Sequence, residues 1–109
     1  MINFQPGDVV LLRFPFVGGS QTKIRPALVV LDTGDADVVV ARITTHVYST
    51  SFDVRLTDWQ GAGLIAPSVA RLHKLATLEK ILVYRHLGTV QPTDRQLLSQ
   101  VLQATFGNW

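Results

Sequence analysis

An arginine, a proline and an unbroken apolar run stand together in the stretch Lys23-Ile24-Arg25-Pro26-Ala27-Leu28-Val29-Val30. Proline restricts its own backbone and disfavours a helix at the residue before it, so Arg25 begins an extended segment. A continuous apolar run of this length is expected where both faces of a strand are covered. The stretch therefore predicts a buried strand over residues 26–31. A guanidinium held at the rigid edge of such a strand is well placed to bind phosphate.

Five or six segments of the chain have the apolar or alternating pattern of short strands: 9–14, 26–31, 37–44, 52–56, 68–73 and 81–87. Within the fourth segment, the alternation predicts that Phe52, Val54 and Leu56 point inward, whereas Asp53 and Arg55 point outward. Loops are expected between these segments, among them a loop over residues 16–23 that contains glycine and serine. Residues 76–80 predict a short helical turn.

The C-terminal segment changes from a strand period to a helical period. One stripe at helical spacing is formed by Leu97, Leu98, Val101, Leu102, Thr105 and Phe106. Pro92 suits the first turn of a helix, Asp94 suits the positive end of the helix dipole, and Gly107 suits the C-cap. A mainly β fold with one C-terminal helix is therefore predicted. The strand count favours a small, partly open barrel or a strongly twisted sheet on which the helix docks.

The composition limits the possible classes of protein. With 109 residues, the chain is expected to form one domain, residues 1–109. Hydrophobic residues make up 47% and charged residues 17% of the chain, a charge-poor composition that favours a homodimer. The net charge of +2 permits contact with RNA through a local patch, but it does not favour a protein that coats DNA.

The absence of cysteine excludes disulfides, thiolate metal sites and a cysteine nucleophile. None of the three histidines has a paired ligand spacing, so we expect no metal and no cofactor. The first residues lack the layout of a signal peptide, and no apolar run is long enough to span a membrane. These features predict a soluble cytoplasmic protein that does not contact a membrane.

Several blocks of the sequence occur in the order found in a known family. The blocks are Gly7-Asp8-Val9-Val10, Gly18-Gly19-Ser20-Gln21, Arg25-Pro26-Ala27-Leu28-Val29-Val30, Ile43-Thr44-Thr45 and Ser68-Val69-Ala70-Arg71-Leu72-His73-Lys74-Leu75-Ala76-Thr77-Leu78. Together they resemble the MazF/PemK-like toxins of bacterial toxin–antitoxin pairs, from Gly7 to the final helix. The resemblance implies an SH3-like barrel with a C-terminal helix, as in MazF, PemK and CcdB, and a homodimer.

The same resemblance implies an activity. Members of this family are metal-independent endoribonucleases that cut single-stranded RNA, including mRNA, at short sequences. A cognate antitoxin inhibits them, and the complex with the antitoxin implies weak DNA binding. Metal-free cleavage needs a base for the ribose 2′-OH, an acid for the leaving 5′-oxygen and cations for the phosphoryl oxygens. The expected product carries a 2′,3′-cyclic phosphate.

Four residues take the family's catalytic positions under this resemblance. Arg25 matches the arginine of the Arg-Pro block, Thr44 matches a threonine after the third strand, and Arg71 matches an arginine of a later strand. His73 stands where some members have an aspartate proposed as general base. The resemblance therefore implies that Arg25 and Arg71 hold the scissile phosphate. Thr44 would assist them, and His73 would act as base or acid.

Ser20, Gln21, Lys23 and Thr45 are the candidate RNA-binding residues outside this group. Ser20 departs from the family, since many members have a glutamate at that position. Each of these residues also has a structural interpretation. Ser20 and Gln21 would belong to a flexible linker, Lys23 would be a solvated charge, and Thr44 with Thr45 would form ordinary strand or turn structure.

The charged candidates have structural alternatives too. Arg25 would be a surface arginine paired with Asp53 or Asp58. Arg71 and His73 lie two residues apart, so they share one face of the predicted strand. In the structural interpretation, that face is only a solvated polar face beside the core. Because the two usual carboxylates are absent, a catalytically weak member that only binds RNA or a protein partner is an alternative function. A gyrase-inhibiting toxin of the CcdB type is a further alternative.

Overall fold

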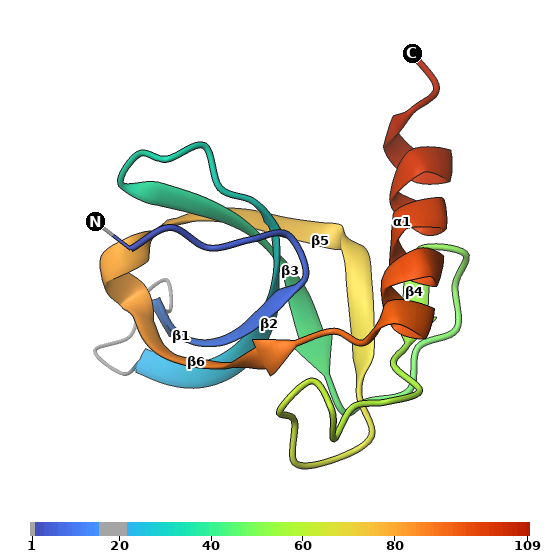
Figure 1. Ribbon diagram of the computed structural model, residues 1–109, viewed down its shortest axis with the longest axis horizontal. Helices are drawn as coiled ribbons and strands as arrows, with labels where there is room; N and C mark the ends of the chain where they lie inside the picture. Colours follow the sequence, from blue (N-terminus) through green and yellow to red (C-terminus); the bar gives the residue numbers. More distant parts are fainter. Residues whose placement is uncertain (1, 16–21) are drawn as a thin grey trace.

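The computed structural model describes residues 2–15 and 22–109. In this part of the chain, six strands form one antiparallel sheet in the order β4-β5-β3-β2-β1-β6. The elements are β1 (Asp8–Pro15), β2 (Thr22–Leu31), β3 (Asp37–Thr44), β4 (Asp53–Arg55), β5 (Val69–Glu79), the 3₁₀ turn η1 (Lys80–Leu82), β6 (Val83–Thr89) and α1 (Pro92–Phe106). The sheet coils into a small, partly open barrel, and α1 stands beside β4 and β5 (Figure 1). The predicted mainly β fold with a C-terminal helix is confirmed.

Two local predictions are wrong. Lys23 belongs to β2 and not to the preceding loop, because its backbone pairs with Phe14 of β1. Residues 76–79 continue β5 and form no helical turn, since Ala76 and Leu78 pair with Val40 and Val38 of β3. A helical turn follows only at η1. Pairing with a neighbouring strand, which the local sequence does not reveal, decided both cases.

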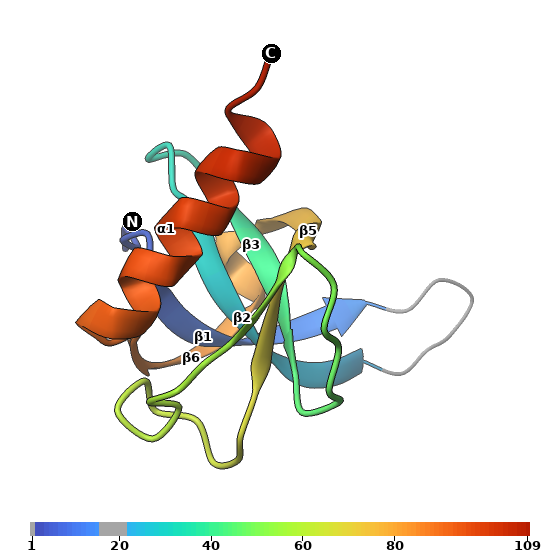
Figure 2. The same cartoon turned by 90° about the vertical axis from the view of Figure 1, so that its right-hand side faces the viewer.

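Both faces of the central strands are buried, which explains the unbroken apolar run of β2. One core lies inside the barrel and consists of Val10, Leu12, Ala27, Val29, Val38 and Val40. The other core includes Val9, Leu28, Ala41, Ile43, Leu72 and Leu98. Since successive residues of a strand point to opposite faces, neighbours such as Leu28 and Val29 enter different cores. Figure 2 shows α1 lying across the face that carries the second core.

Helix α1 is held at its first turn by a buried carboxylate. Asp94 accepts hydrogen bonds from Thr57 N at 2.9 Å, Thr57 Oγ1 at 2.7 Å and Asp58 N at 2.9 Å. Burial raises the pKa of Asp94, but these hydrogen bonds outweigh it, so the pKa lies below its ordinary value. Along the predicted stripe, Leu98 is buried, whereas Leu97 and Phe106 are exposed. The helix thus docks through a narrower face than the stripe predicts.

The alternation predicted for residues 52–56 is correct at three of the five residues. Val54 and Leu56 are buried and Arg55 is exposed, as expected. Phe52 is 38% exposed, and the Asp53 side chain, which was expected to point into solvent, is only 1% exposed. β4 comprises only Asp53–Arg55, so Phe52 lies before the strand. Its side chain therefore does not have to follow the alternation of the strand. The carboxyl of Asp53 is buried because it has a charged partner on the neighbouring strand.

The described residues contain no helix that is long and apolar enough to cross a membrane.

Candidate functional site

Strand β5 is interrupted where two of the predicted catalytic residues lie. Ala41 of β3 pairs with Leu75, but the next residue, Arg42, pairs with Arg71. Residues 72–74 are therefore an irregularity with no partner on β3, and β5 bends sharply in this region (Figure 1). His73 lies in the middle of the irregularity, between the paired residues 69–71 and 75–79 of β5.

The register of the sheet brings three predicted residues to one face. Ala27, Arg42 and Arg71 are direct partners across β2, β3 and β5, so their side chains lie on the same face. Arg25 shares this face because it is two residues from Ala27, and Thr44 shares it because it is two residues from Arg42. The face is the one that forms the barrel interior farther along the sheet.

Four cations line a cavity of about 510 Å³ at this end of the barrel. We call it the cationic pocket and define its charged rim as Lys23, Arg25, Arg42 and Lys74; its apolar floor is Phe14, Val40, Leu75 and Ala76. The four rim residues are exposed. No aspartate or glutamate lines the cavity among the described residues. The positive charge of the rim therefore faces a partly apolar hollow.

The alternative in which Arg25 pairs with a carboxylate does not hold in the described part of the chain. Within residues 2–15 and 22–109, Arg25, Arg42 and Lys74 take part in no ion pair. Asp53 pairs with Arg71, and Asp58 accepts from the backbone N–H of Gly61 at 2.8 Å. The charges of these three rim residues are left uncompensated.

Arg71 lies in a second group, the shielded cluster, which we define as Tyr48, Asp53, Arg71 and His73. Arg71 Nε donates to Asp53 Oδ1 at 2.8 Å, and the two side chains are 10% and 1% exposed. The ring centroid of Tyr48 lies 3.5 Å from Arg71 Cζ, so the ring covers one side of the guanidinium. The charge of Arg71 is thus compensated and largely removed from solvent.

The other carboxylate oxygen of Asp53 is also satisfied. Asp53 Oδ2 accepts from Thr50 Oγ1 at 2.6 Å and from Thr50 N at 3.1 Å. Burial raises the pKa of Asp53, but the hydrogen bonds from Arg71 and Thr50 outweigh this effect and hold the pKa below its ordinary value. Asp53 is therefore ionised at neutral pH and neutralises Arg71.

His73 contacts the shielded cluster through one ring nitrogen. Its Nε2 lies 3.5 Å from Arg71 Nη2, and because a guanidinium can only donate, Nε2 is the acceptor in this contact. Its Nδ1 is buried and makes no hydrogen bond among the described residues. The ring is also tilted against Phe52 at a centroid distance of 5.1 Å. The structure thus brings Arg71 and His73 together, as predicted from their spacing, but in a covered environment.

Thr44 and Thr45 belong to neither the cationic pocket nor the shielded cluster. Thr44 Oγ1 accepts from His46 N at 3.1 Å, so its hydroxyl takes part in the turn after β3, and Thr45 is exposed in that turn. Ser20 and Gln21 lie outside the described residues. The residues that the sequence analysis missed are Arg42, Tyr48, Asp53 and Lys74. Arg42 could have been identified from the sequence, because it lies two residues before Thr44 in the same predicted strand and therefore shares its face.

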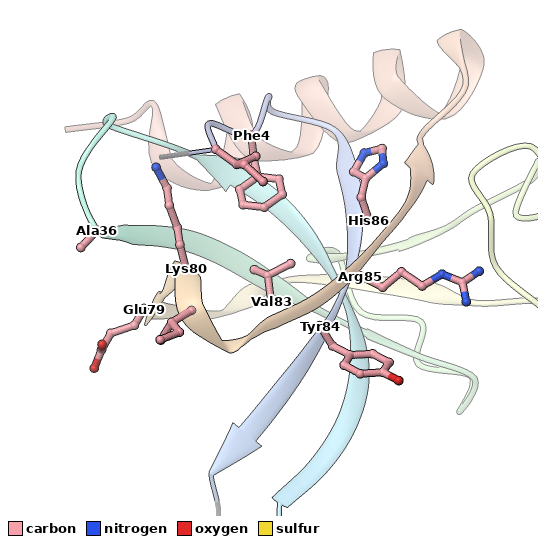
Figure 3. A pocket seen from close by; sticks show the side chains of 10 residues that line it. Phe4, Ala36, Glu79, Lys80, Val83, Tyr84, Arg85 and His86 are labelled. Atoms are coloured by element: carbon pink, nitrogen blue, oxygen red, sulfur yellow. The ribbon is translucent and has the colours of Figure 1, made fainter.

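A larger cavity of about 610 Å³ lies between the N-terminal segment, η1 and β6 and contains none of the predicted site residues. Figure 3 shows Phe4, Lys80 and Val83 in its wall, with Tyr84 and Arg85 pointing away from Phe4. Lys80 forms an ion pair with Asp32 at 2.8 Å, and its hydrogen bond lowers the pKa of Asp32 to about 2. Within residues 2–15 and 22–109, no group of three or more histidine or acidic side chains could hold a metal ion.

Comparison with known families gives one match over nearly the whole chain. The model of the PemK-like, MazF-like toxins of type II toxin–antitoxin systems matches residues 5–106. None of the curated proteins compared with this sequence matches it.

Several solved structures have a similar fold. An endoribonuclease from a mycobacterial species is 21% identical with a TM-score of 0.78, and the match covers 100% of this chain and 97% of that one. The Mycobacterium tuberculosis toxin MazF-mt6 is 21% identical with a TM-score of 0.75, covering 94% and 99%. A MazE–MazF structure from Deinococcus radiodurans is 19% identical with a TM-score of 0.77, covering 100% of both chains. Likeness at these identities shows the fold.

Proposed function

We propose that this chain, which belongs to the PemK-like, MazF-like toxins of type II toxin–antitoxin systems, is an endoribonuclease that cuts single-stranded RNA without a metal ion. The observation that carries the proposal is the position of Arg25. It is exposed on the rim of a pocket that no described aspartate or glutamate lines, forms no ion pair with a described residue, and lies on the sheet face shared with Arg71. Solved structures of the same fold include an endoribonuclease, which supports the same activity.

In the proposed reaction, the ribose 2′-oxygen attacks the adjacent phosphorus and the bond from phosphorus to the 5′-oxygen breaks. A base takes the proton of the 2′-OH, and an acid gives a proton to the departing 5′-oxygen, which leaves a 2′,3′-cyclic phosphate. Arg25 binds the phosphoryl oxygens and stabilises the charge that develops on them. His73 moves a proton, because an imidazole nitrogen can accept a proton or donate one.

The shielded cluster limits how Arg71 and His73 take part. Tyr48 covers the guanidinium of Arg71, and Asp53 occupies its Nε. A phosphate that approaches Arg71 from the face covered by Tyr48 would therefore have to displace the ring. Thr44 assists by a hydrogen bond once its hydroxyl leaves the turn. This shielding favours one alternative function, a chain that binds RNA through the cationic pocket and does not cut it.

The family also supports proposals about partners. We expect a cognate antitoxin to bind and inhibit the chain, since one structure of similar fold is a mycobacterial endoribonuclease in complex with its cognate antitoxin. We further expect a homodimer, and a cytoplasmic location where mRNA is accessible.

Cleavage of a long single-stranded RNA in EDTA tests the proposal. We expect discrete cuts that leave 2′,3′-cyclic phosphates. Arg25→Ala should lower kcat by about 100-fold or more, as expected for loss of a group that stabilises charge in the transition state. Arg55→Ala, which removes an exposed arginine from β4, is the matched control and should cut like the parent chain.

Two outcomes would count against parts of this proposal. RNA that stays intact but binds in a salt-dependent manner would establish the binder in place of the enzyme. Cleavage by His73→Ala at the parent kcat would remove His73 from the proton transfer.

A further inference from the structure

The cationic pocket has more positive charge than one phosphate requires. Arg25 alone can meet the scissile phosphate in the proposed function. Arg42 and Lys74 lie on the same rim, are exposed and form no ion pair with a described residue. Exposed cations that converge on a hollow without a compensating carboxylate attract anions and hold them there. Besides Lys23, the rim cations Arg42 and Lys74 therefore remain for a second anionic group.

The floor of the pocket is apolar, which a simple anion site does not need. Phe14 and Ala76 are half-buried beside the barrel core, and Leu75 is 40% exposed. Bases of single-stranded RNA stack on aromatic and apolar side chains, while their phosphates lie on arginine and lysine. A rim of cations around an apolar floor fits a ligand with both parts, and the cavity of about 510 Å³ is of ordinary size for a small-ligand site.

The pocket adjoins the shielded cluster along two strands. Arg42 is the register partner of Arg71, and Lys74 follows His73 in the irregular part of β5. A strand of RNA whose scissile phosphate lies at Arg25 would therefore pass over Arg42 and Lys74 with its next nucleotide.

We infer that the cationic pocket is a subsite for a nucleotide that flanks the cut, with its phosphate on Arg42 and Lys74 and its base on the apolar floor. The inference rests on the proposed binding of RNA. It assigns Arg42 and Lys74 to substrate binding and leaves the reacting atoms to other residues.

The test uses a short 2′-O-methyl RNA, which has no free 2′-OH and so cannot be cut. We expect the double variant Arg42→Ala/Lys74→Ala to raise Kd for this probe on the order of ten-fold at physiological salt. The slope of log K against log salt should become shallower by about 0.7 for each phosphate that the variant no longer neutralises. Arg55→Ala removes one exposed charge elsewhere and should keep at least half of the parent affinity. Because all three side chains are exposed, each variant should retain the parent Tm.

The floor is tested with Leu75→Ser and a second probe that carries the same phosphates without bases. The variant should weaken binding of the base-bearing probe several-fold and leave binding of the abasic probe unchanged. Equal weakening of both probes would overturn the assignment of the base to the floor.

These experiments distinguish a failure of the subsite from a failure of the proposed function. If the Arg42→Ala/Lys74→Ala variant binds the probe as tightly as Arg55→Ala does, the subsite is refuted whether or not RNA is cut. If the parent chain binds the probe through these two residues and leaves cleavable RNA intact, the subsite stands and the endonuclease proposal falls.

Discussion

Two arginines on one face of the sheet have opposite surroundings. Arg25 lies on the rim of the cationic pocket, exposed and without an ionic partner among the described residues. Arg71 is buried, donates to Asp53 at 2.8 Å and is covered by the ring of Tyr48. Sequence motifs place both arginines in the same role. The structure shows that, of these two, Arg25 alone is available to an anion without rearrangement, because the charge of Arg71 is already neutralised.

The cationic pocket and the shielded cluster also differ in the step of the proposed function to which they would contribute. The cationic pocket combines exposed cations with an apolar floor, the features on which the proposed RNA binding rests. The shielded cluster contains His73, the candidate for proton transfer, and its buried Nδ1 makes no hydrogen bond among the described residues. Under the proposed function, Arg25 would bind RNA without rearrangement of the described residues, whereas the Tyr48 ring blocks one face of Arg71 beside His73.

The largest expected effect concerns the buried ion pair. Asp53→Ala leaves the Arg71 charge buried without its partner, and removing one member of a buried pair costs about 3–5 kcal/mol. Arg25→Ala should change the free energy of unfolding by less than about 0.5 kcal/mol, because its side chain is exposed and has no ionic partner among the described residues. Urea unfolding of the two variants measures both values. Similar small effects would mean that Arg71 is not shielded and that the comparison is wrong.

The pH dependence of stability sharpens the same comparison. The pKa of Asp53 lies below its ordinary value of about 3.9, so its contribution to stability is complete above that pH and decreases as the pH falls through the folded-state pKa. Asp53→Asn should therefore lose less stability than the parent chain on acidification, and the profile of Arg25→Ala should match that of the parent. Urea midpoints measured from about pH 7 down to pH 2 give the profiles. Parallel profiles for all three chains would show that the ion pair contributes nothing.

Asp32 and Asp94 also have lowered pKa values, so some acid sensitivity should persist in the Asp53→Asn variant.

The smallest expected effect concerns the ring over Arg71. Tyr48→Leu should lower the free energy of unfolding by about 1 kcal/mol, since a cation held against an aromatic face away from solvent is stabilised by that amount or more. Tyr84→Leu is the matched control, because its ring lies 5.0 Å from Arg13 Cζ and is largely exposed. The control should cost less than Tyr48→Leu in thermal unfolding. A larger loss for Tyr84→Leu would contradict the shielding by Tyr48.

Much of the fold could be predicted from local pattern. The β-branched segment 37–44 and the helix with Pro92 near its start and Gly107 at its end match β3 and α1. The errors lie where a distant segment decided the outcome. Residues 76–79 form a strand because their backbone pairs with β3. The Asp53 side chain is buried because Arg71 lies opposite it on β5.

In the candidate site, too, local features could be predicted from the sequence, whereas contacts between distant segments could not. The proximity of Arg71 and His73 was predicted correctly from their spacing, whereas the functional role assigned to Arg25 stays a prediction. The grouping of Arg25 with Arg42 and Lys74 comes from three strands, so no local pattern contains it. Tyr48 was missed because it lies in a loop whose path depends on how β3 and β4 are joined.

The strand segments, the amphipathic helix and the family could all be identified from the amino-acid sequence, because periodicity and ordered motifs are local properties of the chain. Which arginine is free to bind an anion emerged only when the chain was folded. That outcome depends on burial and on carboxylates that lie far away in sequence, Asp53 for Arg71 and none for Arg25 in the described part of the chain. The apolar run after Arg25 thus predicted a buried strand, but only the packing around that strand left its guanidinium exposed and uncompensated.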